Sequence, residues 1–159
     1  MKTRALASAD ASAVAEVWLA GAHESAAVDG AFRPRVSVSE YGASLAEEFA
    51  SGAIVGWGCF SAEGSLLGYL TARASEASRE FVPAKYLYLL DLDVRSSARR
   101  QGIASELVRT ARLFAAASGL ASVEVSWLIA DARATAFWRA RGFVQYLARA
   151  RSAVAVEAP

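Results

Sequence analysis

The stretch Val94–Leu107, VRSSARRQGIASEL, places Arg99 and Arg100 directly before a glycine-containing turn and an amphipathic segment. Apolar residues recur at steps of three and four after Gly102, a spacing that predicts an α-helix. Unpaired backbone N–H groups and the helix dipole make such an entrance favourable for anions. Two arginines at the same place predict a polyanion, and a pyrophosphate would satisfy both the guanidinium and the backbone donors. The alternative is a solvated basic turn without a ligand.

The segments on either side of this stretch alternate between strand and helix patterns. Residues 85–94, KYLYLLDLDV, read as a buried strand before the turn, and Gly119 is a favoured residue just past the end of the following helix. The first half of the expected order is a strand at 3–6, a helix from Asp10 to about Gly21, a loop at 23–35 and a helix at 38–50. A hairpin of 53–60 and 65–73 and a loop at 74–84 then lead to the strand at 85–94. After it come the helix from 103, a strand at 122–129, a helix from Asp131 to Gly142, and a last strand region starting FVQYL at 143. This order predicts a mixed-sheet α/β domain.

Length and composition narrow the class of protein. A chain of 159 residues with 55% hydrophobic content suits a single domain over residues 1–159. The net charge of +1 gives no global field for binding nucleic acid or a membrane surface, so neither is expected as a partner. A lone cysteine, Cys59, excludes an intrachain disulfide, and the N-terminus lacks the apolar core of a signal peptide, so a cytoplasmic protein is expected. No run of about twenty apolar residues predicts a membrane span.

Two other phosphate-binding motifs are excluded. A Walker loop needs a Gly-Lys pair, and neither Lys2 nor Lys85 follows a glycine. The glycines of Gly52–Gly58 lie within a hairpin strand, and Ser61 occupies the third dinucleotide position, so this segment is not a Rossmann loop.

Two motifs carry a resemblance to a known family. The first reads Leu-x-Val followed by Arg-x-x-Gly-x-Ala at the entrance of a helix, and the second is DARATAFWRARGF at residues 131–143. The positions that match are Leu92, Val94, Arg99, Gly102 and Ala104 in the first motif and Asp131, Ala134, Phe137, Trp138, Gly142 and Phe143 in the second. With both motifs separated by one helix and one strand, the chain resembles the GNAT superfamily of acyl-CoA-dependent N-acetyltransferases.

The resemblance implies a fold, a cofactor and a reaction. The fold is a mixed, mostly antiparallel sheet splayed between two central strands and flanked by helices, and the donor is acetyl-CoA with no metal. An amine would attack the thioester directly, without a covalent enzyme intermediate, so Cys59 is expected to be a small core residue rather than a nucleophile. The resemblance places the cofactor on Leu92, Asp93, Val94, Arg99, Arg100, Gln101, Gly102, Ile103, Ala104, Ser105, Asp131, Phe137 and Trp138. The pantetheine arm would bond to the strand backbone as an added strand does.

The catalytic candidates are carboxylates, because an attacking ammonium must lose a proton. Alternation places Asp91 and Asp93 on the strand face opposite Leu92 and Val94, and carboxylates on a buried strand are costly unless they are paired or used. The resemblance makes Asp91 the first candidate for the base or the amine anchor, because many family members carry an acidic residue near the acceptor amine three residues before the valine, here Val94. The alternative is a strand-end carboxylate paired with an arginine. Glu124 on the next strand is the second candidate, the alternative being a paired or rim residue.

Two positions depart from the family pattern. Trp138 stands where the family often has a tyrosine that protonates the leaving thiolate, and an indole N–H is no comparable acid. Trp138 therefore either belongs to the core or lines the acyl pocket, while Tyr88, Tyr146 or water takes the acid's place. Asp131 replaces the usual asparagine and serves equally well as a helix cap.

The acceptor is the least determined part of the prediction. The resemblance places it among the first two helices and the loops around residues 22–35 and 74–85, where acidic and basic residues are mixed. The single histidine, His23, is interpreted as a surface or capping residue. We therefore expect an N-acetyltransferase acting on an amine of a small molecule or a protein, and the resemblance makes a homodimer reasonable. Alternatives are a noncatalytic acyl-CoA sensor of the same fold and an unrelated α/β domain with a basic turn.

Overall fold

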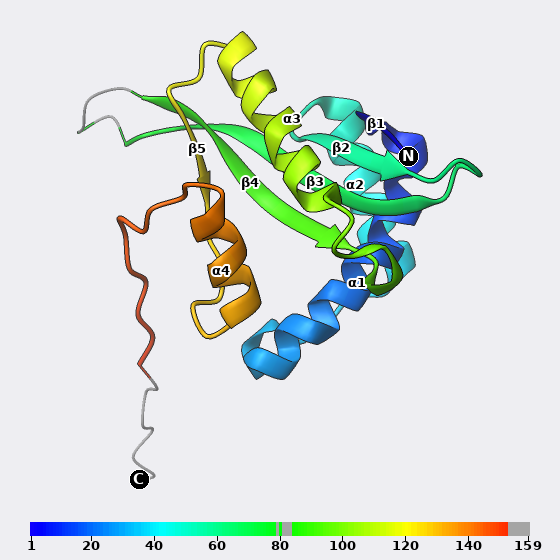
Figure 1. Cartoon of the computed structure of the whole chain (residues 1–159), viewed down its shortest axis with the longest axis horizontal. Helices are drawn as coiled ribbons and strands as arrows, with labels where there is room; N and C mark the ends of the chain where they lie inside the picture. The colour runs from blue at the N-terminus through cyan, green and yellow to red at the C-terminus, as the bar shows by residue number, and fades with distance from the viewer. Residues whose placement is uncertain (79, 81–83, 153–159) are drawn as a thin grey trace, which may run out of the picture.

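The computed structural model describes residues 1–78, 80 and 84–152 and contains one five-stranded sheet in the order β1-β2-β3-β4-β5 (Figure 1). The strands are β1 Lys2–Ala5, β2 Val55–Phe60, β3 Leu66–Glu76, β4 Lys85–Val94 and β5 Ser122–Val125. The helices are α1 Ala11–Val28, α2 Val38–Ser51, α3 Ile103–Ala117 and α4 Ala132–Ala140, with short 3-10 turns at Ser8–Asp10, Gly30–Phe32 and Ser96–Ala98. Strands β1 to β4 are antiparallel and β5 is parallel to β4, which confirms the expected mixed and mostly antiparallel sheet.

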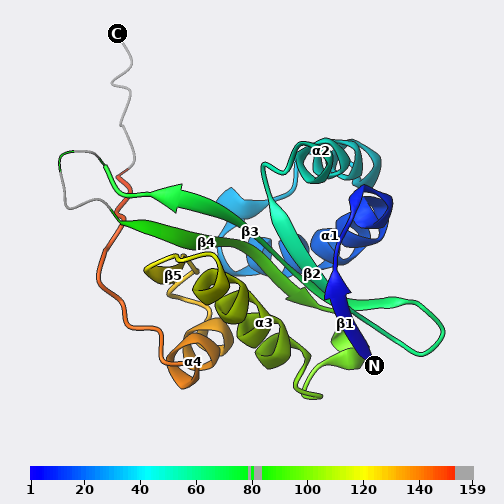
Figure 2. The same ribbon diagram turned by 90° about the horizontal axis from the view of Figure 1, so that it is seen from above.

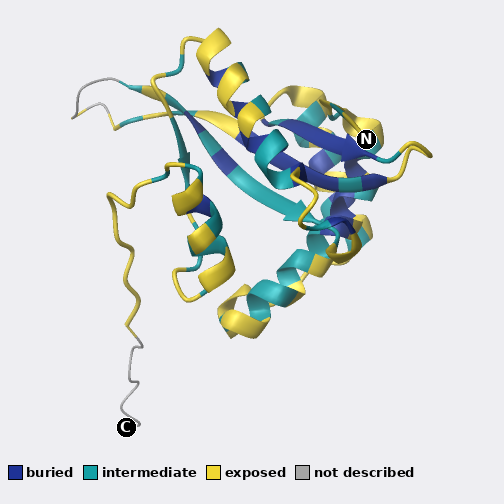
Figure 3. Ribbon diagram, viewed as in Figure 1, coloured by how far each residue is buried: buried dark blue, intermediate teal, exposed yellow. Residues whose placement is uncertain are grey.

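Helices cover both faces of the sheet. In Figure 2, α1 and α2 lie on one side and α3 and α4 on the other. The burial colouring agrees, since β2 and β3 are buried in the middle while the lower end of α1 is a mixture of intermediate and exposed residues (Figure 3). No helix among residues 1–78, 80 and 84–152 is long and apolar enough to cross a membrane.

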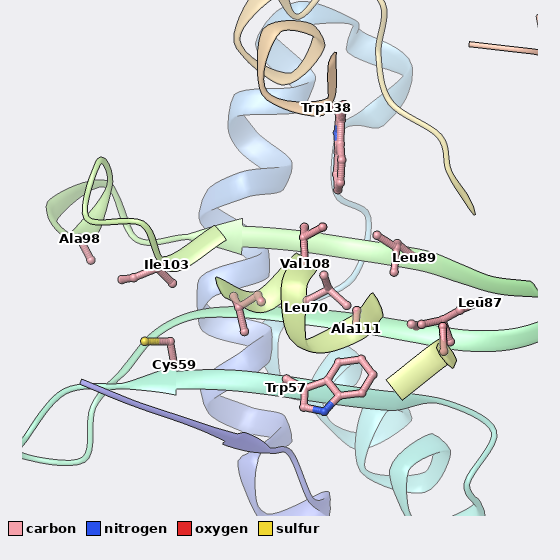
Figure 4. Packing of buried hydrophobic residues seen from close by; sticks show 13 residues of the cluster. Trp57, Cys59, Leu70, Leu87, Leu89, Ala98, Ile103, Val108, Ala111 and Trp138 are labelled. Atoms are coloured by element: carbon pink, nitrogen blue, oxygen red, sulfur yellow. The ribbon is translucent and has the colours of Figure 1, made fainter. Parts of the chain in front are cut away.

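The larger core cluster lies between the sheet and α3 (Figure 4). Leu70 of β3, Leu87 and Leu89 of β4, and Leu107 and Ala111 of α3 are almost entirely shielded from solvent there. The helical members recur at three- and four-residue steps, the spacing that the sequence predicted for this face. A second cluster between the sheet and α1 with α2 includes Val14, Val17, Leu45 and Tyr69.

A bulge in β4 changes which side chains face α3. Opposite β3, Leu89 pairs with Ala72 and Asp91 pairs with Thr71, so Leu90 is an extra residue in β4. Before the bulge Leu89 packs on the α3 side, and after it Leu92 does. Asp91 and Asp93 consequently face α1 and α2, opposite Leu92 and Val94 as alternation predicted.

The sheet opens between β4 and β5. Tyr86 to Leu89 pair with Ser122 to Val125, whereas residues 90–94 of β4 continue without a partner in β5. The two strands diverge from this point in Figure 1. The free edge of β4 is therefore next to the helix entrance at Gly102.

Helix α1 passes through Gly21, so the predicted end of this helix was wrong. Glycine inside a helix costs about 1 kcal/mol relative to alanine, which is why the sequence suggested a stop. A Cβ at position 21 would overlap the Asp93 carboxylate, so the glycine allows β4 and α1 to approach closely. The expected cap by Asp10 was also wrong in detail, because its side chain binds Arg4 and accepts from the Ala7 N–H instead.

The last predicted strand is not formed in the described part of the tail. Residues 143–152 form neither helix nor strand, and β5 ends at Val125 rather than 129. Only Phe143 is packed, against Trp138, while Val144, Tyr146 and Leu147 are exposed. Alternating apolar side chains stabilise a strand only when one face is buried, and here neither face is. The loop predicted at 74–84 is partly the end of β3, and its residues 79 and 81–83 lie outside the described residues.

Helix α3 supplies a matched pair of leucines for a stability test. Leu107 is 0% exposed and Leu113 is 57% exposed. We expect Leu107→Ala to lower the free energy of unfolding by about 2–5 kcal/mol, because it leaves a cavity under the sheet. Leu113→Ala should change it by less than about 0.5 kcal/mol, as measured by urea denaturation. Equal losses in the two variants would contradict the assigned helix face.

Candidate functional site

The turn that leads into α3 has a backbone suited to an anion. Arg100 and Gly102 both adopt left-handed conformations, with φ of 65° and 82°. Within the described residues, nothing accepts a hydrogen bond from the backbone N–H groups of residues 100–105. A non-glycine residue at positive φ is strained, and such strain is concentrated at ligand-binding turns. This turn, Arg99–Gly102, together with the first N–H groups of α3 therefore offers several free donors at the positive end of the helix, and it is named the anion turn.

Arg99 is held at the end of β4 rather than extended into solvent. Its Nε donates to the Val94 carbonyl at 3.0 Å, and its guanidinium donates to Glu24 at 2.6 Å. Arg133 of α4 donates to the other oxygen of Glu24 at 3.0 Å. The hydrogen bond from Arg99, followed by that from Arg133, lowers the pKa of Glu24. Glu24 thus joins α1 to the anion turn and to α4, and an anion at Arg99 would share or displace this carboxylate.

The remaining residues predicted around the cofactor divide into donors and core residues. Arg100 and Gln101 are exposed on the turn, and Ala104 and Ser105 form the first turn of α3. Ile103 is buried in the core, so only its backbone N–H is available to a ligand. A hollow of about 330 Å³ adjoins the same turn and is lined by Met1, Thr3, Cys59, Gln101, Gly102, Ile103 and Glu106.

Residues of the second motif cap and pack helix α4. Asp131 accepts from the backbone N–H groups of Arg133 and Ala134, so its carboxylate caps α4 as expected. Trp138 is 6% exposed and packs edge-on against Phe137 and Phe143. The structure therefore places Trp138 in the core.

Asp91 and Asp93 form a carboxylate pair held by hydroxyl groups. Tyr41 of α2 and Thr71 of β3 donate to Asp91 at 3.3 and 3.4 Å, and Tyr69 donates to Asp93 at 3.1 Å. Burial raises the pKa of Asp91. Burial, and next the charge of Asp91, raise the pKa of Asp93 to about 7. Because the pKa of Asp93 is about 7, its carboxyl group can take up or release a proton near neutral pH.

Glu124 does not join this pair. It lies on β5 opposite Tyr88, where β4 and β5 are still paired, and Tyr146 Oη donates to it at 2.6 Å. Of the two catalytic candidates, Asp91 therefore lies beside the splay with Asp93, and Glu124 is a paired residue before it. His23 is exposed on α1, and Cys59 is buried on β2.

Several residues of the site were not identified from the sequence. Tyr41 reaches Asp91 from a helix that is distant in the chain, and no local pattern signals such a contact. Tyr69 and Thr71 alternate along β3, which is a weak signal that both hydroxyls face α1 and α2. Glu24 is one of the acidic residues of the segment around residues 22–35, and no local pattern signals that it pairs with Arg99 and Arg133.

An open sheet edge beside a helix entrance with free N–H groups has the geometry that suits an extended, phosphate-bearing ligand. A model of the acetyltransferase (GNAT) family matches residues 21–143, so the chain belongs to that family. No curated protein matches the chain closely enough to add to this assignment.

Solved structures agree with the fold. A mutant of the BH1408 protein from Bacillus halodurans has a TM-score of 0.83 at 16% identity, over 98% of this chain and 100% of that one. Aminoglycoside antibiotic 6'-N-acetyltransferase AAC(6')-IG from Acinetobacter haemolyticus has a TM-score of 0.75 at 14% identity, over 99% and 100%. A GCN5-related N-acetyltransferase from Ralstonia eutropha has a TM-score of 0.73 at 20% identity, over 96% and 97%. Structural similarity at identities this low shows a common fold and does not identify a substrate.

The raised pKa of Asp93 predicts a pH-dependent stability. Because this pKa rises from 3.8 to about 7 on folding, the folded protein holds the proton more tightly than the unfolded chain. The contribution of Asp93 to stability is therefore complete below about pH 4 and is lost as the pH rises to about 7. We expect Asp93→Asn to gain a few kcal/mol relative to wild type between about pH 5 and pH 8, since one pKa unit corresponds to about 1.4 kcal/mol.

Urea denaturation at a series of pH values measures this difference. Asp10→Asn is the control, because the hydrogen bond from Arg4 lowers the pKa of Asp10. The stability that the Asp10 carboxylate contributes is therefore lost only as the pH falls into the acidic range. A difference between Asp93→Asn and wild type that stays constant over the whole range would contradict the assignment.

Proposed function

We propose that this protein is an N-acetyltransferase that transfers the acetyl group of acetyl-CoA directly to an amine of a small molecule or a protein. The observation that carries the proposal is the turn before α3, where free N–H groups of residues 100–105 meet Arg99 and Arg100 at the open end of β4. Membership of the acetyltransferase family supports it.

The residues present fit coenzyme A. The free N–H groups of the turn, with Arg99 and Arg100, suit a pyrophosphate, because guanidinium and backbone donors together satisfy its oxygens. The unpartnered edge of β4 at residues 90–94 suits the amide groups of the pantetheine arm. Acetyl-CoA would supply an activated acetyl carbonyl and a thiol leaving group at this edge.

The carboxylate pair suits the removal of a proton from the acceptor. A base works best when its pKa is near the working pH, and that of Asp93 is about 7. Asp91 lies on the same face of β4, and hydroxyl donors fix both carboxylates in place. Asp91 would hold or deprotonate the amine, and Asp93 would share the proton taken up.

A second candidate is an acyl-CoA sensor that has lost the chemistry. It is favoured by the position of Trp138, which lies in the core where many family members have a catalytic tyrosine. Turnover separates the two candidates, because a sensor binds coenzyme A and releases no thiol from acetyl-CoA in the presence of an amine.

Calorimetric titration of coenzyme A tests the anion turn. We expect Arg99→Ala/Arg100→Ala to weaken binding roughly 10- to 100-fold, because two charge-assisted contacts to phosphate are removed. Arg109→Ala is the control, since Arg109 lies on α3 with Glu106 as its partner. A higher salt concentration should weaken coenzyme A binding more in the wild type than in the double variant. If the double variant bound coenzyme A with wild-type affinity, the turn would not be part of the cofactor site.

A thiol-release assay over a panel of amines tests the carboxylates. The panel should contain aminoglycosides, polyamines, amino acids and lysine peptides. We expect Asp91→Asn to lower kcat/KM by about 10²- to 10⁴-fold while coenzyme A affinity is kept, because the proton acceptor is lost. Glu124→Gln is the control and should stay within about threefold, since this carboxylate is bound to Tyr146. Equal losses in the two variants would mean that Asp91 has no special role.

A further inference from the structure

If the protein is an acetyltransferase as proposed, a proton must reach the sulfur that leaves the acetyl group. Trp138 cannot supply it, because its indole is an acid too weak for this step and lies in the core. Hydroxyl groups of tyrosine are the most suitable alternative donors among uncharged side chains. The chain has five tyrosines, and their positions decide between them.

Two of the five tyrosines serve the carboxylate pair. Tyr41 Oη donates to Asp91 and Tyr69 Oη donates to Asp93. Burial, followed by the charge of Asp91, raises the pKa of Tyr41 and that of Tyr69 well above the ordinary value. Both hydroxyls are therefore poor proton donors to a leaving group.

Two further tyrosines are unsuited by their partners or positions. Tyr146 Oη donates to Glu124 at 2.6 Å, and this hydrogen bond is the main cause that raises the pKa of Tyr146 to about 12. Its side chain also lies on the exposed segment after α4. Tyr86 pairs with Ser122 at the start of β5, the end of the β4–β5 ladder that is farthest from the opening.

Tyr88 lies at the point where the sheet opens. Its partner in the ladder is Glu124, and the ladder ends one pair later at Leu89 and Val125. Its Oη lies 2.9 Å from the Oγ of Ser126, the first residue after β5. The two hydroxyls therefore bridge the strands where they begin to separate. Leu87 and Leu89 face α3, so alternation puts Tyr88 on the same face of the sheet as Asp91.

We propose that Tyr88 is the proton donor to the leaving thiolate and that Ser126 restores its proton from solvent. In this step the bond between the amine nitrogen and the acetyl carbon forms and the bond from carbon to sulfur breaks. The carboxylate pair takes one proton from the amine, and the sulfur takes one from Tyr88 Oη. Tyr88 regains a proton from Ser126 Oγ, and Ser126, which is exposed, regains one from water. The carboxylate pair releases the proton of the amine to solvent, so the protons balance.

The hydroxyl pair has the properties that such a relay needs. Each hydroxyl both donates and accepts, so the bond between Tyr88 and Ser126 reverses when the phenol proton turns toward the sulfur. Ser126 is exposed, whereas Tyr88 is half-buried. One end of the pair therefore contacts water and the other faces the opening between the strands.

The bound thiol of free coenzyme A gives a readout that needs no turnover. Its pKa is measured from the ultraviolet absorbance of the thiolate in the complex as a function of pH, with the complex of desulfo-coenzyme A as the blank. A hydroxyl that donates to sulfur stabilises the thiolate, so we expect Tyr88→Phe to raise this thiol pKa by about one unit or more. Tyr86→Phe, on the same face of the same strand, is the matched control and should leave it unchanged.

Two further measurements complete the test. Calorimetry should show coenzyme A affinities within about twofold of wild type for Tyr88→Phe and Ser126→Ala, because neither residue belongs to the anion turn. Thiol release should fall roughly 10²-fold in Tyr88→Phe, and by less in Ser126→Ala, since water can replace the serine.

The outcomes separate this inference from the proposed function. An unchanged thiol pKa in a Tyr88→Phe variant that binds coenzyme A overturns the role of Tyr88 and leaves the acetyltransferase standing. A wild-type protein that binds no coenzyme A overturns both. If Tyr88→Phe fails to fold, Ser126→Ala decides, because loss of the relay must still slow thiol release relative to Tyr86→Phe.

Discussion

Strand β4 is hydrogen-bonded to neighbours on both sides as far as Leu89 and to β3 alone beyond it, and the site depends on this change. The parallel ladder with β5 ends at Val125, just where the extra residue Leu90 shifts the alternation of β4. The shift keeps leucine and valine side chains toward α3 on both sides of the bulge. It also leaves Asp91 and Asp93 on the other face, where residues 90–94 of β4 have no partner in β5.

Burying two carboxylates on one strand is unfavourable, and three hydroxyl donors reduce this cost. Tyr41, Tyr69 and Thr71 each donate to one of the two aspartates. A buried carboxylate with such donors is retained at less cost than an unpaired one, although burial still raises both pKa values. A pair of this kind contributes little to stability at neutral pH, which is the usual sign that it serves another purpose.

The fold was largely predictable from the sequence because periodicity reports which face of each element is buried. The segment 85–94 was predicted with the bounds that β4 has, and Asp131 and Gly142 delimit α4 as expected. Predictions failed where a distant contact decided the outcome. Gly21 lies inside α1, where the Asp93 carboxylate leaves no room for a side chain, and the tail after Phe143 buries too little to form a strand.

The candidate site was predictable only in its local parts. The turn at Arg99–Gly102 and the cap by Asp131 follow from short motifs, since backbone conformation and free N–H groups are properties of neighbouring residues. The hydroxyl donors and the Glu24 contacts join elements far apart in the chain, and no spacing in the sequence encodes them. For the same reason the role of Trp138 stayed open between core and acyl pocket until its ring contacts were known.

Helix α1 connects the two halves of the site. Its backbone at Gly21 contacts Asp93, and one turn later Glu24 binds Arg99 and Arg133. The charge of Glu24 raises the pKa of Asp93, and that of Arg99 lowers it. An anion that pairs with Arg99 offsets the positive charge that lowers the pKa of Asp93, and it adds negative charge nearby. Asp93 would then hold a proton more tightly. A phosphate at Arg99, as proposed, would thus raise the pKa of Asp93, and α1 is the helix that contacts both groups.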